Sequence, residues 1–302
     1  MLRLIDRPGH HALLRVPPST RAVVSWNTDA PSGGIALIAH RADATVSEPL
    51  LYARWSPEER RSLDGADAST RIEVDVLRSE VALSAVGVAS TVELDAVAVA
   101  VPPPPDARVP ARERTRPLDV PKLSQYLNAY PDERGWCSVA ALAMLLQYHQ
   151  IAADVPTVAR GVYDSSYRGT GNWAFNAAYA GARGLRGVIA YLRGIDHVAA
   201  FVEAGLPVAI SIGWQPGEFP GAPLEHSDGH LLVVRGVEPG HVVVNDPAHP
   251  AVGTRYPRAA LDLVFRTHGG VAYLVAPRER TPELVALANN AEPVAAGGPA
   301  PR

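Results

Sequence analysis

Residues 135–148 read Gly-Trp-Cys-Ser-Val-Ala-Ala-Leu-Ala-Met-Leu-Leu-Gln-Tyr, and this stretch decides how the rest of the chain is interpreted. Ala, Leu, Met and Gln are strong helix formers, and the segment after Ser138 is apolar on nearly every side, which predicts a buried helix. Cys137 is the only cysteine of the chain. A thiol at the start of a helix lies near the positive end of the helix dipole, which favours the thiolate. The stretch therefore predicts a reactive cysteine at the start of a central helix.

Length and charge limit the classes of function. A chain of 302 residues is long enough for two domains, and a net charge of −3 without a basic cluster argues against nucleic acid as a partner. One cysteine cannot form an internal disulfide. Neither a signal-peptide core nor an apolar run of membrane-spanning length is seen, which predicts no membrane span and a cytoplasmic location. Secretion is expected only if an N-terminal signal was removed or lies outside this chain.

A proline run marks the expected domain boundary. Four consecutive prolines follow Val101, and a charged stretch comes after them. Such a run favours an extended polyproline conformation and acts as a spacer. The domains are therefore expected at residues 1–101 and 118–278, with a linker at 102–117. Residues 279–302 are rich in Ala, Pro and Gly and are expected to form a flexible tail.

The first domain has the pattern of a small all-β sandwich. Four segments have strand-like alternation or a β-branched composition: residues 35–38, 71–77, 81–88 and 91–101. Short strands separated by Gly, Pro, Ser and Asp are typical of sandwiches. A set of side chains suited to a glycan or protein ligand consists of Trp26, Tyr52, Arg54 and Trp55. Closure of the core is the favoured interpretation of these aromatic residues, and a ligand of this domain stays open.

The second domain changes from helical to strand periodicity. Helices are expected from Cys137 and at residues 172–182 and 195–204, where Gly205 and Pro207 supply the stop signal. Strands are expected at residues 207–212, 230–237, 241–245 and 270–276. Helices followed by an antiparallel sheet predict an α+β fold.

Two strand ends supply partners for a cysteine nucleophile. His230 opens an apolar strand, and an imidazole near neutrality can accept a thiol proton. The turn at residues 238–240 folds the next strand back, which brings Asp246 close to His230. A carboxylate there would orient the ring and stabilise its charged form. A structural histidine and a turn-opening Asp-Pro are the alternatives, and Asn245 is the weaker orienter because it faces the opposite side of a regular strand.

The order Gln125, Cys137, His230, Asp246 resembles that of the papain-like cysteine peptidases, and most closely their bacteriocin-leader (double-glycine) peptidase-like branch. The resemblance covers roughly residues 118–278. The motifs that carry it are Val120-Pro121-Lys122-Leu123-Ser124-Gln125, Gly135-Trp136-Cys137-Ser138, Asp228-Gly229-His230-Leu231-Leu232-Val233-Val234-Arg235-Gly236 and Val243-Val244-Asn245-Asp246-Pro247.

The resemblance implies a papain-like domain, with N-terminal helices packed on an antiparallel sheet, after the all-β domain. It implies a thiol nucleophile at Cys137, a general base at His230, an orienting carboxylate at Asp246 and an oxyanion donor at Gln125. No ATP-transporter segment accompanies the motifs, so a stand-alone domain is implied.

Two further sets of residues have a pattern that a site could use. His226 and His230 have the spacing of a helical metal pair, but Ser-Asp-Gly between them is poor helix, so no metal or other cofactor is expected. Trp136, Trp173 and Trp214 are predicted to wall a substrate groove, with closure of the core as the alternative.

The expected function is that of a cysteine peptidase or amidohydrolase that cleaves a peptide or protein substrate through a Cys-His-Asp triad and an acyl-enzyme. Two alternatives remain open. A transglutaminase-like acyl transferase shares the chain order Cys, His, Asp. A binding protein that keeps the fold without activity would need none of this chemistry.

Overall fold

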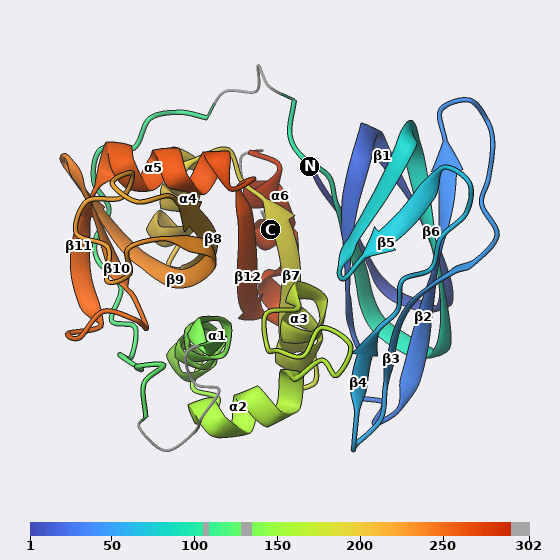
Figure 1. The fold of residues 1–302 in the computed structure, drawn as a ribbon, viewed down its shortest axis with the longest axis horizontal. Coiled ribbons are helices and arrows are strands. Elements are labelled where there is room, and N and C mark those ends of the chain that lie inside the picture. The colour runs from blue at the N-terminus through green and yellow to red at the C-terminus, as the bar shows by residue number, and fades with distance from the viewer. Residues whose placement is uncertain (105–108, 128–134, 291–302) are drawn as a thin grey trace, which may run out of the picture.

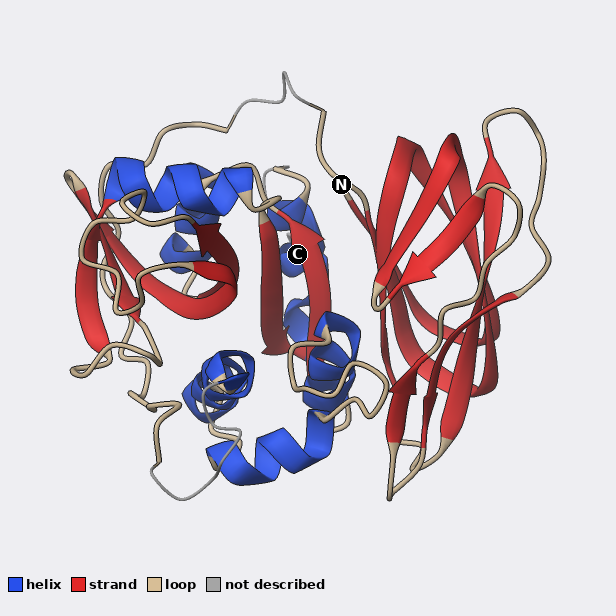
Figure 2. Ribbon diagram, in the orientation of Figure 1, coloured by secondary structure: helices blue, strands red, loops and turns tan. Residues whose placement is uncertain are grey.

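The computed structural model describes residues 1–104, 109–127 and 135–290. The described chain is mixed α/β, with two antiparallel six-stranded sheets (Figure 1). The helices gather around the second sheet and the first sheet is built of strands and loops (Figure 2). The first sheet contains β1 (Leu2–Asn27), β2 (Gly33–Arg41), β3 (Leu50–Trp55), β4 (Arg60–Ser62), β5 (Thr70–Glu73) and β6 (Val76–Ala100).

Two long strands dominate the first sheet, whose order is β1-β6-β2-β3-β4 with β5 paired to β6. The separate strands predicted at residues 81–88 and 91–101 are wrong, because both belong to β6. The single strand predicted at residues 71–77 is also wrong. It is a hairpin in which β5 ends at Glu73 and β6 begins at Val76. The alternation of apolar and charged residues continues through this turn, so periodicity does not reveal it. The sandwich architecture stays a prediction.

The second sheet has the order β11-β10-β9-β8-β12-β7. Its strands are β7 (Leu185–Tyr191), β8 (Val208–Trp214), β9 (Ser227–Glu238), β10 (His241–Asn245), β11 (Gly253–Pro257) and β12 (Val271–Pro277). The predicted strands correspond to β8, β9, β10 and β12. Sequence periodicity did not find β7 or β11. The antiparallel order confirms the α+β expectation for this half at the level of elements.

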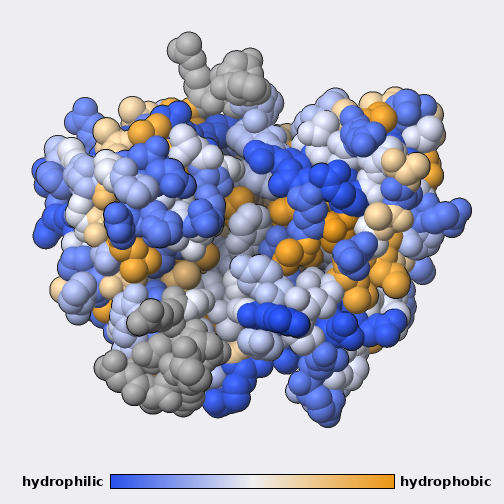
Figure 3. Space-filling view, viewed as in Figure 1, coloured by the Kyte–Doolittle hydropathy of each residue, from blue (hydrophilic) through white to orange (hydrophobic). Residues whose placement is uncertain are grey.

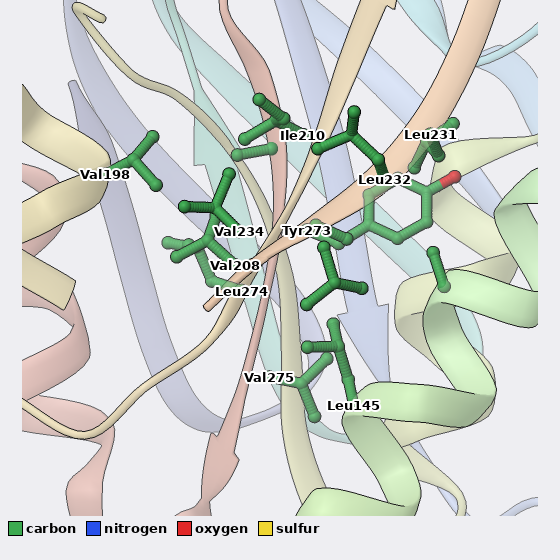
Figure 4. Close-up of a cluster of buried hydrophobic side chains, with 14 of the residues drawn as sticks. Leu145, Val198, Val208, Ile210, Leu231, Leu232, Val234, Tyr273, Leu274 and Val275 are labelled. Carbon is green, nitrogen blue, oxygen red and sulfur yellow. The ribbon is translucent and has the colours of Figure 1, made fainter. Parts of the chain in front are cut away.

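The helices are α1 (Cys137–Tyr148), α2 (Val155–Val162), α3 (Trp173–Gly181), α4 (Ile195–Glu203), α5 (Arg258–Thr267) and α6 (Thr281–Ala288). The predicted helices correspond to α1, α3 and α4. Leu145 of α1 and Val198 of α4 approach the sheet from opposite sides (Figure 4). Every residue of α1 from Ser138 to Leu146 is buried, as expected of a helix that is apolar all round.

The predicted tail at residues 279–302 is wrong where the structure describes it. A short 3-10 turn (Arg278–Arg280) leads into α6, whose Leu284 and Leu287 are buried. The Asn289 side chain then accepts a hydrogen bond from Leu2 N and donates one to Leu2 O, each 2.9 Å long. An eight-residue helix is marginal by propensity, so its order follows from packing that composition does not show. Residues 291–302 lie outside the described residues.

Buried polar contacts join the two sheets. Asn27 of β1 is fully buried, and its Nδ2 donates to Gly187 O of β7 at 2.8 Å. Arg186 donates to Asn27 Oδ1 at 3.1 Å and also pairs with Asp6. Phe175 of α3 packs within the core of the first sheet. Shared buried groups of this kind hold the first sheet in a defined position against β7 and α3.

The predicted linker is partly packed on the second sheet. Thr115 N donates to Val237 O at 2.9 Å, and Val237 N donates back to Thr115 Oγ1 at 2.9 Å. Leu118 N donates to Arg235 O at 2.7 Å. The chain therefore runs along β9 before it reaches the predicted second domain. Residues 105–108 of the linker lie outside the described residues.

The close contact between β7 and α3 makes Gly187 sensitive to substitution. A Cβ at Gly187 would overlap Ala177 O and lie 2.8 Å from Ala180 Cβ. Gly187→Ala is expected to lower the free energy of unfolding by about 1–3 kcal/mol, because overpacking moves backbone. Urea unfolding measures this change in the free energy of unfolding. Gly34→Ala is the control, since its nearest contact would be an ordinary 3.5 Å to Ala53 O. Equal stability of the two variants would contradict the packing argument.

Candidate active site

Cys137 is the first residue of α1 and faces a pocket of about 620 Å³. The thiol is partly exposed, and the helix behind it is buried. Burial alone would raise the pKa of the thiol, but the hydrogen bond and positive charge of His230 lower that pKa below its usual value. The predicted position at a helix start is confirmed, and the helix dipole adds to the same effect.

His230 lies in β9 opposite Ile212 of β8, and its side chain is 2% exposed. Its Nε2 is 2.7 Å from Asp246 Oδ1, which leaves Nδ1 as the ring nitrogen for the hydrogen bond with the Cys137 thiol. Burial would lower the pKa of the imidazole. The charge and hydrogen bond of Asp246 outweigh burial and raise that pKa to about 10. The ring is therefore held in its protonated form beside a thiol whose pKa is lowered.

Asp246 follows β10 and is completely buried. Tyr256 Oη donates to its Oδ2 at 2.7 Å, and Ala248 N donates to its Oδ1 at 2.9 Å. Burial would raise the pKa of this carboxyl, but the charge and hydrogen bond of His230 hold it below its usual value. The β9–β10 hairpin thus brings Asp246 to His230, as the sequence predicts.

Asn245 faces away from the histidine. Its Nδ2 donates to Val120 O and to Pro121 O, each at 3.0 Å, and its Oδ1 accepts from Arg235. This side chain therefore fixes the segment that leads to Gln125, and Asp246 is the residue that contacts the ring.

Gln125 lies beside the turn that follows Asp246. It is buried, and its backbone N–H donates to Pro247 O at 3.1 Å. Ser124 Oγ donates to the same carbonyl oxygen at 3.3 Å. The structure thus places the Gln125 segment next to the Asp246–Pro247 turn, and the oxyanion role of its side chain stays a prediction.

The three predicted groove tryptophans lie in different surroundings. Trp173 lines the pocket of Cys137, whereas Trp136 lines a neighbouring pocket of about 780 Å³. Trp214 is buried, with its ring edge-on to His230 at a centroid distance of 5.9 Å. Phe219 packs between Trp214, to which it is edge-on at a centroid distance of 5.3 Å, and Tyr256, to which it is tilted at 4.6 Å. This aromatic cluster keeps water from the His230–Asp246 pair.

Tyr256 and Phe219 are site residues that sequence reasoning missed. Tyr256 belongs to β11, a five-residue strand without clear alternation, and it reaches Asp246 through the pairing of β10 with β11. Phe219 lies in the loop after β8, where no periodicity exists. Neither position carried a local signal that could have identified it.

Residues 117–273 match the model of the Peptidase_C39 like family. The match spans more than half of the chain. This chain belongs to that family. Family membership supports a cysteine peptidase function in broad terms, and no transporter segment is evident in the part of this C39-like chain that the structure describes. No curated protein matches the sequence.

Solved structures with C39 peptidase folds resemble this C39-like chain at low identity. A C39-like peptidase from Bacillus anthracis is 21% identical and covers 55% of this chain and 99% of its own, with a TM-score of 0.40. A double-glycine-motif protease from an AMS/PCAT transporter, in complex with the leader peptide, is 20% identical over 57% of this chain and 99% of its own (TM-score 0.38). The peptidase domain of the Streptococcus bi-functional ABC transporter ComA is 16% identical and covers 48% of this chain and 93% of its own, with a TM-score of 0.36.

The described residues hold neither a metal-binding cluster nor a membrane-spanning helix. Residues 1–104, 109–127 and 135–290 contain no cluster of three or more His, Cys, Asp or Glu arranged to bind a metal. Over the same ranges no helix is long and apolar enough to cross a membrane.

Proposed function

We propose that this chain is a cysteine peptidase that cleaves a peptide bond through Cys137, His230 and Asp246. The observation that carries the proposal is the chain of hydrogen bonds from the Cys137 thiol through His230 to Asp246, with the thiol at an open pocket. A buried carboxylate, an imidazole and a thiol in this order are the parts of an activated sulfur nucleophile. The same proposal includes a papain-like second domain after an all-β domain, with the linker at residues 102–117.

The first half of the reaction forms an acyl-enzyme. The Cys137 thiolate attacks the carbonyl carbon, and the oxyanion is stabilised by the backbone N–H of Cys137 and the Gln125 side-chain amide. The His230 imidazolium then donates its Nδ1 proton to the leaving amine as the C–N bond breaks. Asp246 accepts the hydrogen bond from Nε2–H throughout, which keeps the ring oriented.

The second half releases the acyl group. Neutral His230 takes a proton from water, and the resulting hydroxide attacks the thioester carbonyl. Collapse of the oxyanion breaks the C–S bond, so the thiolate and the imidazolium are restored together. The 620 Å³ pocket beside Cys137 gives water and substrate access to the sulfur.

Thiol alkylation tests the ion pair directly. Because the pKa of Cys137 is lowered and that of His230 is raised to about 10, the thiolate should persist well below the ordinary thiol pKa of about 8.5. Iodoacetamide should therefore modify Cys137 at pH 6 at least about tenfold faster than it modifies a free cysteine peptide. Mass spectrometry of the modified protein measures the rate from pH 4 to 11. A profile that rises only near pH 8.5 would contradict the proposal.

Product analysis separates hydrolysis from acyl transfer. The same peptide cleavage is run with and without an added primary amine. Free carboxylate product in both cases supports a peptidase, whereas incorporation of the amine in preference to water would identify an acyl transferase.

A further inference from the structure

One wall of the Cys137 pocket is formed by residues of the first sheet. The β5–β6 turn contributes Glu73, Val74 and Asp75 to the lining, and Cys137 and His230 lie on the same pocket. This turn points from the first sheet toward the α3 side of the molecule (Figure 1), and the two halves meet in a crease on this face (Figure 3). The first sheet is therefore part of the environment in which a substrate of Cys137 would bind.

Asp75 is held rigidly at this wall. Its carboxylate Oδ2 accepts a hydrogen bond from Trp173 N at 2.7 Å, and its backbone oxygen accepts one from the buried Tyr52 hydroxyl at 2.9 Å. The residue is 6% exposed. A residue whose carboxylate is held by α3 and whose backbone is held by β3 is a preorganised group.

The Asp75 carboxylate is buried without a cation. No described Lys or Arg forms an ion pair with it. Burial, followed by the charge of Asp164, raises its pKa to about 7. Buried carboxylates are normally paired, since desolvation is costly. Glu73 of the same turn is partly exposed and still pairs with both Arg71 and Arg78.

Tyr273 carries a further polar group that is influenced by the charge of Asp75. The Tyr273 hydroxyl is buried, and none of the described residues accepts or donates a hydrogen bond to it. Burial raises the pKa of Tyr273, and the charges of Asp75 and Cys137 raise it further. Of the described residues that line the pocket, Arg168 carries the only guanidinium, and it is exposed. Among the residues that line the pocket, Asp75 is thus a buried acid without a cationic partner.

We propose that Asp75 is a substrate-specificity residue: its carboxylate pairs with a cationic group of the peptide whose carbonyl is presented to Cys137. The cation is a Lys or Arg side chain or a free amino terminus, all of which offer N–H donors and a positive charge. A substrate ammonium or guanidinium supplies the ion partner that the protein lacks. This inference rests on the proposed peptidase function for its cleavage readout, but not for its binding readout.

A purely structural role is the competing explanation. Asp75 accepts from the first backbone N–H of α3, where a negative charge is favourable to the helix dipole. Asp75→Asn keeps a side-chain oxygen for Trp173 N–H and removes the charge. It therefore separates the two roles better than alanine. Glu80→Gln on β6 is the matched control, because Glu80 is exposed and outside the pocket lining.

The cleavage experiment uses a chymotryptic peptide library with free or acetylated amino termini. Wild type is expected to favour Lys or Arg at one fixed position from the cleaved bond if the cation is a side chain. It is expected to require a free amino terminus if the cation is the terminal amine. Asp75→Asn should lose this preference by about tenfold or more while cleavage of neutral peptides continues, and Glu80→Gln should keep it. The inference is overturned if Asp75→Asn and wild type have the same preference, or if wild type has none for a cation.

The binding experiment does not require activity. Immobilised Cys137→Ala is exposed to the same library, and retained peptides are identified by mass spectrometry. Retained peptides should carry the cation, and Cys137→Ala/Asp75→Asn should lose that enrichment. Replacing Lys by norleucine, or Arg by citrulline, in a retained peptide should weaken binding to Cys137→Ala about tenfold or more, whether or not the Asp75 variant folds. Retention that is indifferent to charge, or no retention, overturns the inference even if peptide cleavage is established.

Discussion

Cys137→Ala is expected to lower kcat/KM for peptide hydrolysis by at least about 10⁴-fold. The reason is that the thiolate forms the covalent bond to the acyl group, and no other described nucleophile shares the hydrogen bond to His230. The loss should appear in kcat and in kcat/KM together, since the interaction is made only along the reaction path. Continuous assay of a fluorogenic peptide found by library cleavage measures it. Full activity in this variant would remove Cys137 from the mechanism.

Cys137→Ser provides the matched control for the shape of the site. The hydroxyl nearly reproduces the thiol volume, but its proton is far harder to remove, so hydrolysis should remain lost. The melting temperatures of both variants should stay close to wild type, because the thiol is partly exposed and the core helix behind it is unchanged. A large drop in melting temperature would mean that lost activity reports unfolding instead of lost chemistry.

The sequence predicts much of the second half of the fold because its signals are local. The apolar run after Cys137, the stop signal at Gly205 and Pro207, and the turn at residues 238–240 each specify an element without reference to distant contacts. The elements that the sequence did not predict depend on contacts between distant parts of the chain. β1 extends over 26 residues because it pairs with β6, and α6 is ordered by packing against β1. Neither contact is encoded in a short window of sequence.

The candidate site likewise contains residues that local sequence signals predict and residues that only distant packing brings in. His230 and Asp246 are separated by one hairpin, so strand periodicity and a turn signal were enough to bring them together. Asp75 reaches the pocket only through the packing of one sheet on the other, and the turn that carries it was hidden by continuous alternation. Val74 in that turn has a φ of 58°, a conformation that β-branched residues rarely adopt. Sequence preference therefore argued against a turn at the position where the tertiary structure has one.

Asp246→Ala is expected to lower kcat/KM by about 10²–10⁴-fold. Without the carboxylate, burial is left as the dominant influence on His230, so the imidazole pKa should fall far below about 10. The thiolate then loses its cationic partner, and the pKa of Cys137 should rise. Alkylation at pH 6 should accordingly slow toward the rate of a free thiol. Unchanged alkylation would contradict the role given to Asp246.

Tyr256→Phe is the control that separates the effect of the Asp246 charge from the effect of the hydrogen bond that Tyr256 donates to it. It removes the 2.7 Å hydrogen bond to Asp246 Oδ2 but leaves the His230–Asp246 pair in place. A loss of kcat/KM of about 10- to 100-fold at most is expected, since a hydrogen bond to a charged carboxylate contributes about 1.5–3 kcal/mol. A loss as large as that of Asp246→Ala would mean that the aromatic cluster, and not the carboxylate charge, holds the ring.

The stability difference between wild type and Asp246→Ala should itself depend on pH. The raised pKa of His230 means that its contribution is fully present below the unfolded value of about 6.5 and is lost as pH rises through about 10. The lowered pKa of Asp246 means that its contribution is present above about 3.9 and is lost as pH falls through the folded value. The difference in unfolding free energy should therefore be largest between about pH 4 and 6.5 and shrink toward pH 10.5. Urea unfolding at pH 6 and pH 10.5 measures it, and a difference that grows with pH would show that the buried pair is not ionic.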